Sequence, residues 1–268
     1  MKKFLSLILA SLMTVSMAAA VSAIEGGEAY GEVPVTGVEV VIDGKLDAIY
    51  QEGLTIDLNA ATADGIAVGT VTLLWNGVDT IYAAFEVEDS TAYLLPDVPN
   101  PRWDADYVEF FLDYSNTAAR AYDQYLIDRQ NNACLSCDGT YSDDAAALAG
   151  YGLIASASSQ TDNGYILEMQ LLAYADTIAA GKNIGVFAGI CDFDAEGGKL
   201  GNTYCVQDGM DINKYGYITL TDNIVNIEPE VTDSAAAGET APQTFDAGMI
   251  ALASAVLSAV GYAVSKKR

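Results

Sequence analysis

Residues 70–87 read TVTLLWNGVDTIYAAFEV, and this stretch decides the fold class. Its first part, Thr70–Trp75, ends at Asn76-Gly77, a dipeptide that favours the tight turn of a β-hairpin. Its second part, Thr80–Val87, alternates apolar with more polar residues, which is the period of a strand with one buried face. We therefore expect two antiparallel strands here, with Trp75 in the core.

The same strand pattern recurs on both sides of this hairpin. Further strands are predicted at 38–42, 107–113, 122–129, 153–158, 165–171, 184–192 and 215–220. Only 172–180, a short stretch rich in alanine, has the composition of a helix. Many short strands with turn signals between them are typical of a sandwich, so we predict an all-β, antiparallel β-sandwich.

Both ends of the chain have the composition of export signals. Lys2-Lys3, an apolar stretch and an Ala-X-Ala site predict a signal peptide over residues 1–23. At the other end, an apolar run at 247–264 precedes a basic terminus, which is the order of a stop-transfer signal. We expect the protein to be exported and displayed at a cell surface.

The C-terminal tail also resembles the sorting signal of Gram-positive surface proteins. In those proteins a sortase cuts after the threonine of a Pro-X-Thr motif, and Pro242-Gln243-Thr244 matches its core. The alternative is a plain single-span membrane anchor. The resemblance implies a sortase as a partner, whereas the plain anchor needs none.

Between these ends we expect one domain of about two hundred residues. Residues 24–37 are predicted to be a lead-in, 38–222 the sandwich, 223–241 a flexible acidic linker, and 242–268 the sorting signal or transmembrane anchor.

Composition excludes several classes of function. The chain has 37 Asp and Glu against 12 Lys and Arg, a formal net charge of −25. Five of the basic residues lie at the two ends, so no basic patch is left to bind phosphates, and no nucleic acid is expected. The chain has no histidine, which excludes His-based triads and the usual zinc and haem sites. We expect no haem and no nucleotide.

The cysteines predict disulfides. An even number of cysteines in an exported chain, here Cys134, Cys137, Cys191 and Cys205, favours two bridges, and three pairings are compatible with the sequence. Cys134-Leu-Ser-Cys137 also has the spacing of a redox pair. It lacks a preceding thioredoxin-like strand and helix, so a structural role is favoured.

Six motifs follow one another along the predicted strands. They are Ile42-Asp43-Gly44-Lys45-Leu46-Asp47-Ala48-Ile49-Tyr50, Leu74–Gly77 with Val87-Glu88-Asp89, Asn100–Asp113, Gly164–Glu168, Ile184-Gly185 with Asp192, and Tyr215–Leu220. In this order the motifs resemble those of family 9 carbohydrate-binding modules, and the resemblance spans about 38–221.

The resemblance implies a β-sandwich that binds a sugar in a groove, often beside structural calcium. Members typically clamp the end of a glucan or xylan chain between two tryptophans, because aromatic faces cover the C–H surface of a pyranose while polar groups bond its hydroxyls. Trp103 matches the first tryptophan, either as a stacking ring or as a ring packed on the rim. Glu109 matches an acid that accepts hydroxyl bonds, or is a solvated or cation-paired strand acid.

The chain departs from the family pattern at three further positions. The second tryptophan is missing, and Tyr204 is the only aromatic residue near its place. Leu126 stands where an arginine is common, and Gly189 where a glutamine is. The predicted sugar site is therefore Trp103, Glu109 and Tyr204.

Calcium is expected on the same resemblance. Asp89, Asp104 and Asp106 flank Trp103 and offer the hard oxygen ligands that calcium prefers.

Three functions follow, from different classes. The favoured one is non-catalytic binding of a polysaccharide or oligosaccharide at a bacterial surface, supporting polysaccharide breakdown by surface glycoside hydrolases. The second is an adhesion or structural sandwich module that binds a protein. A glycoside hydrolase is least favoured, because the sequence supplies many acids but no distinctive pair spaced across a scissile bond.

Overall fold

The computed structural model describes residues 27–62, 66–93, 105–116, 123–137, 140–142, 145–173, 178–206 and 214–227. The predicted signal peptide and sorting signal lie outside these ranges. Within them, no helix has the length and apolar character needed to cross a membrane.

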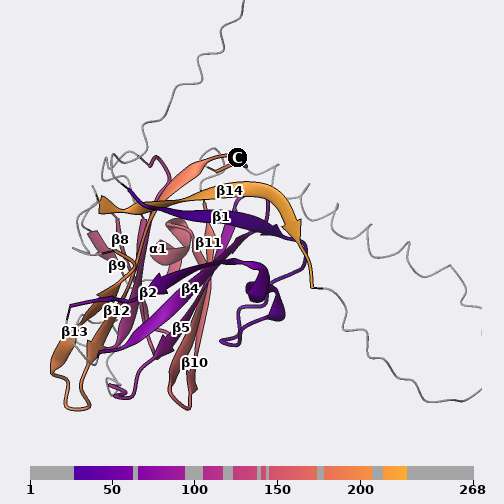
Figure 1. Ribbon diagram of the computed structural model, residues 1–268. Coiled ribbons are helices and arrows are strands. Elements are labelled where there is room, and N and C mark those ends of the chain that lie inside the picture. Colours follow the sequence, from indigo (N-terminus) through magenta and orange to yellow (C-terminus); the bar gives the residue numbers. More distant parts are fainter. Residues whose placement is uncertain are drawn as a thin grey trace, which may run out of the picture. The chain divides into compact units, whose positions relative to one another are not determined.

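Nearly all the regular structure in these ranges is β-strand (Figure 1). The strands are β1 (Ala29–Thr36), β2 (Leu54–Leu58), β3 (Ala60–Ala61), β4 (Val68–Trp75), β5 (Thr80–Glu88), β6 (Tyr107–Asp113), β7 (Asp123–Asp128), β8 (Ala133–Cys137), β9 (Thr140–Ser142), β10 (Leu153–Thr161), β11 (Gly164–Leu172), β12 (Asn183–Phe193), β13 (Lys199–Tyr204) and β14 (Gly216–Val225). The helical elements are η1 (Ala48–Glu52), a 3₁₀ turn, and α1 (Ala145–Gly150).

The strands form two layers that share one hydrogen-bonded path. One layer runs β10-β11-β5-β4, with β2 paired to β4. The other runs β14-β12-β6-β7-β8-β9, with β13 paired to β12. Strand β1 joins them, because it pairs in parallel with β14 and meets β4 at one residue pair, Val35 with Trp75. The predicted β-sandwich is confirmed.

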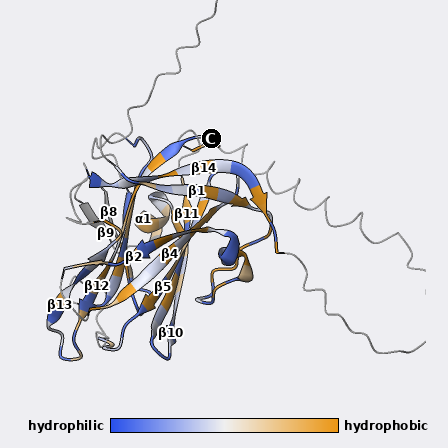
Figure 2. Cartoon of the chain, viewed as in Figure 1, coloured by the Kyte–Doolittle hydropathy of each residue, from blue (hydrophilic) through white to orange (hydrophobic). Residues whose placement is uncertain are grey.

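The main core lies between the layers. Phe85 of β5 meets Phe110 of β6 edge to face, with ring centroids 5.9 Å apart. Trp75 is 2% exposed in the same core, as predicted. Apolar and hydrophilic residues alternate along many of the strands (Figure 2), which places one set of side chains toward this core.

The hairpin between β4 and β5 is confirmed, and its turn is built by local chemistry. The Asn76 side-chain oxygen accepts the backbone N–H groups of Val78, Asp79 and Thr80, each at 2.9 Å. Gly77 has a φ of +78°, which glycine adopts without steric cost. The Asn-Gly pair thus fixes the register of β4 against β5.

Two of the motifs contact each other directly. The Glu168 carboxylate of β11 accepts the N–H groups of Asp43 at 3.1 Å and Gly44 at 2.8 Å. Gly44 has a φ of +81°, and a Cβ there would lie 3.0 Å from the Ser158 backbone. The Ile-Asp-Gly and Gly-Tyr-X-X-Glu motifs therefore form one structural unit, in which the opening loop packs on the outer face of β11.

Some predicted boundaries differ from the structure. The expected lead-in contains strand β1, whereas 38–42 forms no strand. The helix expected at 172–180 overlaps the last residue of β11, and 174–177 of that stretch lie outside the described residues; the helix α1 lies at Ala145–Gly150. Residues 223–225, which were expected to belong to a linker, are instead the end of β14, and the expected linker beyond 227 lies outside the described residues.

Candidate functional site

The outer face of β6 and β12 carries a second aromatic cluster, which Tyr204 and Tyr215 complete. Every residue of β6 and of β7 is buried, although the sequence pattern of β6 alternates. Phe187 stands at the centre of the cluster, with ring centroids 5.2 Å from Phe111, 5.2 Å from Tyr204 and 5.1 Å from Tyr215. This face is therefore an aromatic platform rather than a solvated strand surface.

Glu109 lies on this platform, in the middle of β6. Its neighbours in register are Leu126 of β7 and Gly189 of β12. Its side chain is 2% exposed, and its Oε1 has no hydrogen-bond partner among the described residues. Burial raises the pKa of Glu109 to about 7, and the charge of Lys199 opposes that rise. Near neutral pH this carboxyl can therefore accept a hydroxyl hydrogen bond or donate one.

The Tyr204 ring lies beside Glu109 because residue 189 is glycine. Tyr204 of β13 is directly opposite Gly189 in the antiparallel ladder. A Cβ at residue 189 would come within 2.7 Å of the Tyr204 ring and 3.2 Å of Glu109 Cγ. The Tyr204 hydroxyl accepts a hydrogen bond from the Asn202 amide. Burial and the Glu109 charge raise the pKa of Tyr204 to about 12, so this hydroxyl stays neutral.

Two of the three predicted sugar-site residues are thus neighbours, while Trp103 lies outside the described residues. Tyr107 and Lys199, which interact with Glu109, and Asn202, which bonds Tyr204, were not predicted as site residues. Tyr107 lies two residues before Glu109 on the same strand, so the period of two could have indicated it. Lys199 and Asn202 lie on β13, which was not predicted as a strand.

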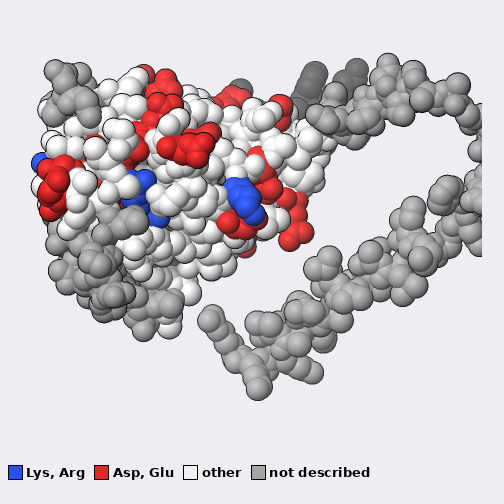
Figure 3. Space-filling view, turned by 90° about the horizontal axis from the view of Figure 1, so that it is seen from below, with Lys and Arg blue, Asp and Glu red and all other residues white. Residues whose placement is uncertain are grey.

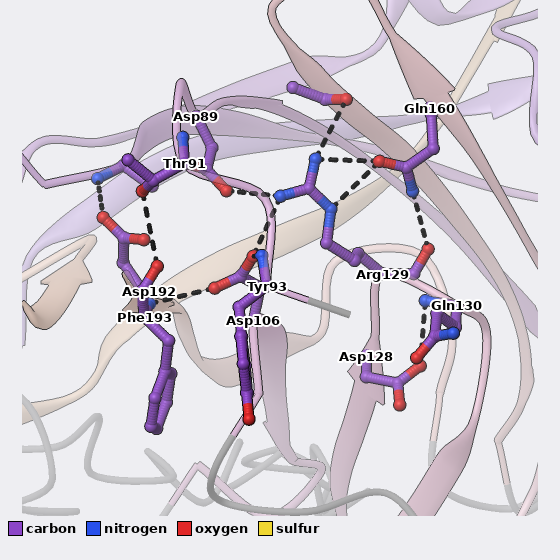
Figure 4. A network of polar contacts seen from close by, with 12 residues as sticks. Asp89, Thr91, Tyr93, Asp106, Asp128, Arg129, Gln130, Gln160, Asp192 and Phe193 are labelled. Atoms are coloured by element: carbon purple, nitrogen blue, oxygen red, sulfur yellow. Dashed lines mark hydrogen bonds and ion pairs between the residues drawn. The ribbon is translucent and has the colours of Figure 1, made fainter. Parts of the chain in front are cut away.

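Asp89 and Asp106, two of the predicted calcium ligands, are brought together by the fold, and Asp192 joins them. Ligand oxygens of the three carboxylates lie within 4.8 Å of one another, and all three residues are buried. Arg129, at the end of β7, reaches into this group (Figure 4). Its Nη1 lies 2.6 Å from an Asp89 oxygen and 2.9 Å from an Asp106 oxygen. Asp104 lies outside the described residues.

The predicted disulfides are not formed in the structure. Cys134, Cys191 and Cys205, whose side chains are described, form no disulfide. Cys134 on β8 and Cys191 on β12 are separated by β7 and β6, a distance of roughly 14 Å at the usual strand spacing. That distance is too long for a bridge. The Cys205 sulfur instead accepts hydrogen bonds from the Tyr30 hydroxyl at 3.3 Å and from Ala188 N–H at 3.2 Å.

Acidic residues are more widespread than basic ones over the described surface drawn in Figure 3. This agrees with the composition of the whole chain. Since the platform is apolar and its one central acid is close to neutral, the candidate site differs in character from the surface around it.

Comparison with known families identifies the domain. The sequence model of the family described as "Carbohydrate family 9 binding domain-like" matches residues 42–223. The chain belongs to this family. The family is one of binding modules, in agreement with the expectation that the chain is not an enzyme.

Solved structures share the fold of this family 9 domain. A family 9 carbohydrate-binding module from Caldicellulosiruptor kristjanssonii, in complex with cellotriose, superposes with a TM-score of 0.57 at 18% identity, covering 74% of this chain and 100% of that one. The complex of a module from the same organism with glucose also gives 0.57, at 19% identity and the same coverage. A putative carbohydrate-binding protein from Bacteroides uniformis gives 0.54 at 12% identity, covering 72% of this chain and 99% of that one.

A curated relative is similar in sequence. The exoglucanase XynX of Acetivibrio thermocellus is 29% identical over 191 residues, which cover 68% of this chain and 16% of the relative. The family 9 domain therefore spans about a sixth of the length of the curated relative it matches.

Proposed function

We propose that this domain binds a glucan-type oligosaccharide or polysaccharide, without catalysis, on the platform that carries Glu109 and Tyr204. The observation that carries the proposal is the Glu109 carboxyl, which is buried among aromatic rings with one oxygen unpartnered in the described structure. Such a group is costly unless something bonds it, and a sugar hydroxyl does so. Similar modules have been solved with cellotriose and with glucose, which supports this choice of ligand class.

Each residue has a distinct role in this proposal. Tyr204, which is 9% exposed and packs against the buried Phe187 ring, lines the floor of the proposed site and contacts the C–H surface of a pyranose. The Glu109 Oε1 bonds a hydroxyl and orients the sugar. Trp103, which precedes β6 by four residues, is assigned the stacking role on the family resemblance. Because Leu126 and Gly189 replace polar residues of the family pattern, the site has fewer hydrogen-bonding groups. It therefore recognises its sugar more through stacking than through hydrogen bonds.

Binding of the exported chain, residues 24–241, to glucose, cellotriose and xylan oligosaccharides tests the proposal. Wild type is expected to bind at least one of them, and Trp103→Ala and Glu109→Gln each to weaken that binding by at least about tenfold. The measurement is isothermal titration calorimetry. Val78→Ala, which alters a side chain that is 67% exposed, is the matched control and should bind as wild type does.

Two results would contradict the proposal. One is a folded domain that binds no glycan, which would favour the adhesion module and a protein ligand. The other is binding that neither substitution weakens, which would place the sugar elsewhere on the domain.

We further propose that the domain is exported by residues 1–23 and held at the cell surface through residues 242–268, where it keeps substrate near partner hydrolases. The sequence order of charged, apolar and small residues at both ends supports this. Cleavage after Thr244 by a sortase is preferred to a plain membrane anchor. Structural calcium at Asp89, Asp104 and Asp106 is not part of this proposal, because Arg129 already lies against Asp89 and Asp106.

Thr244→Ala separates the two anchors. If a sortase joins the protein to the wall, the variant should move from the wall fraction to the membrane fraction, because the tail is no longer exchanged for a wall bond. Cell fractionation and immunoblotting measure the shift, with Thr221→Ala as a control outside the motif. An unchanged distribution would favour the plain anchor.

A further inference from the structure

Three buried carboxylates meet at one end of the sandwich. Asp89 follows β5, Asp106 precedes β6, and Asp192 lies near the end of β12; their exposed fractions are 7%, 1% and 2%. Three negative charges this close, and removed from water, destabilise a fold unless a cation or protons compensate them. The family resemblance suggests calcium for this role.

The arrangement of donors does not fit a calcium ion. Calcium takes six to eight oxygen ligands. Here backbone N–H groups take the carboxylate oxygens instead: Thr91 bonds Asp89 Oδ1 at 2.7 Å, and Ala67 bonds Asp192 Oδ2 at 2.7 Å. The N–H groups of Tyr93 and Phe193 bond the two Asp106 oxygens, at 2.8 Å and 2.9 Å.

Arg129 completes the set of donors. Its Nη1 bonds the remaining Asp89 oxygen and shares Asp106 Oδ2 with Tyr93. Of the six oxygens, only Asp192 Oδ1 has no hydrogen-bond partner in the described structure. A site with one unbonded oxygen and many N–H donors stabilises negative charge. It does not supply the six to eight oxygen ligands that calcium takes.

The guanidinium is itself held by the opposite layer. Its Nε and Nη2 both donate to Gln160 Oε1, at 3.0 Å and 2.8 Å, and its carbon lies 4.8 Å from the centre of the Tyr165 ring. The backbone oxygen of Arg129 accepts hydrogen bonds from the Ser158 hydroxyl and the Gln160 amide, both at 3.0 Å. Figure 4 shows the Arg129 side chain bonded to Asp89, Asp106 and Gln160. Arg129 therefore ties β7 to β5, β10 and β11.

We propose that Arg129 is the cation of this cluster. It compensates the negative charge of the three carboxylates, a role for which related domains would use a divalent metal. A guanidinium suits the position because its planar set of donors reaches two carboxylates and an amide oxygen at once. The negative charge of the cluster is then compensated by Arg129 together with the surrounding backbone N–H donors, and its stability does not depend on dissolved calcium.

A comparison of wild type with Asp192→Asn tests the proposal. The substitution keeps the oxygen that accepts the Ala67 N–H and removes the charge that an ion would need. A hollow of about 370 Å³ that Asp89 and Asp192 help to line opens beside the cluster, so ions can reach it. Thermal unfolding of the exported chain is followed in millimolar CaCl₂ and in EDTA.

We expect the calcium-induced change in Tm to be the same in the two proteins, whatever its size. Any ion bound elsewhere on the chain contributes equally to both and cancels. A calcium-induced rise in Tm that is larger in wild type than in Asp192→Asn would show an ion at the cluster and overturn the proposal.

Removal of the arginine gives a second, independent readout. Arg129→Met, measured in EDTA, should lower Tm by about 10 °C, because it leaves buried charge without compensation. The Tm of Arg129→Lys should lie between those of wild type and Arg129→Met, since lysine keeps the charge but loses the forked contacts with Gln160. An unchanged Tm in Arg129→Met would contradict the proposal even if calcium had no effect.

Discussion

Glu109→Gln is expected to raise the free energy of unfolding by about 3 kcal/mol at pH 8 and to leave it nearly unchanged at pH 4. Burial raises the pKa of the Glu109 carboxyl from 4.5 to about 7 in the folded protein. Between those two values the unfolded chain ionises while the folded protein stays protonated. Wild type therefore loses stability as the pH rises from about 4.5 to about 7, and above that range the loss is constant. Glutamine does not titrate and is spared this loss.

Urea unfolding of both proteins at pH 4, 6 and 8 measures the difference. Glu196→Gln is the matched control, because it makes the same chemical change at an exposed position. If the free energy of unfolding of Glu109→Gln changed with pH in parallel with that of wild type, the carboxyl would not be buried as described.

The same residue is expected to serve binding at a cost to stability. Glu109→Gln should unfold less readily at pH 8 and yet bind sugar less tightly. Groups kept in unfavourable surroundings are often functional ones, and an acid on an aromatic platform fits that pattern. If the substitution stabilised the domain and left sugar binding intact, Glu109 would be no more than a buried strand acid.

Phe187→Ala is expected to lower the free energy of unfolding by about 3–5 kcal/mol. The Phe187 ring is fully buried and has aromatic neighbours on three sides, so its removal leaves a cavity that rigid strands cannot close. The Tyr204 ring would lose its support and its fixed position beside Glu109. Sugar affinity should therefore fall together with stability.

Chemical denaturation and calorimetric titration of the same preparation measure both effects. Phe187→Leu is the graded control, because it keeps most of the apolar volume and should cost less than the alanine substitution. A loss of stability with unchanged sugar affinity would separate the platform from the binding site.

The parts of the fold that depend on local chemistry were predictable. Asn76-Gly77 encodes its own turn, and β6 was placed at its observed bounds by the alternation of Tyr107–Asp113. Strand β1 was missed because its hydrogen-bonding partner is β14, nearly two hundred residues later, and because Pro34 interrupts its pattern. No local signal reports a pairing over that distance.

The sequence predicted which residues belong to the site but not how they are arranged. The positions of Glu109 and Tyr204 came from motif order, whereas their contact depends on a small residue, Gly189, facing a large one across two strands. Arg129 was not singled out, since in sequence it is one basic residue at a strand end. Its role depends on three acids that come from three separate strands. The even number of cysteines predicted disulfides that do not form, because the number of cysteines carries no information about which strands are neighbours.

The pairing of the first and last strands has a mechanical consequence. Strands β1 and β14 run side by side in the same direction, and β14 is also bonded to β12 on its other edge (Figure 1). A pull on the chain beyond Ile227 acts along the length of β14. Its hydrogen bonds to both neighbours then resist together in shear, rather than opening one after another as in a zipper. The domain is thus joined to whatever follows it by a strand that is hydrogen-bonded on both edges.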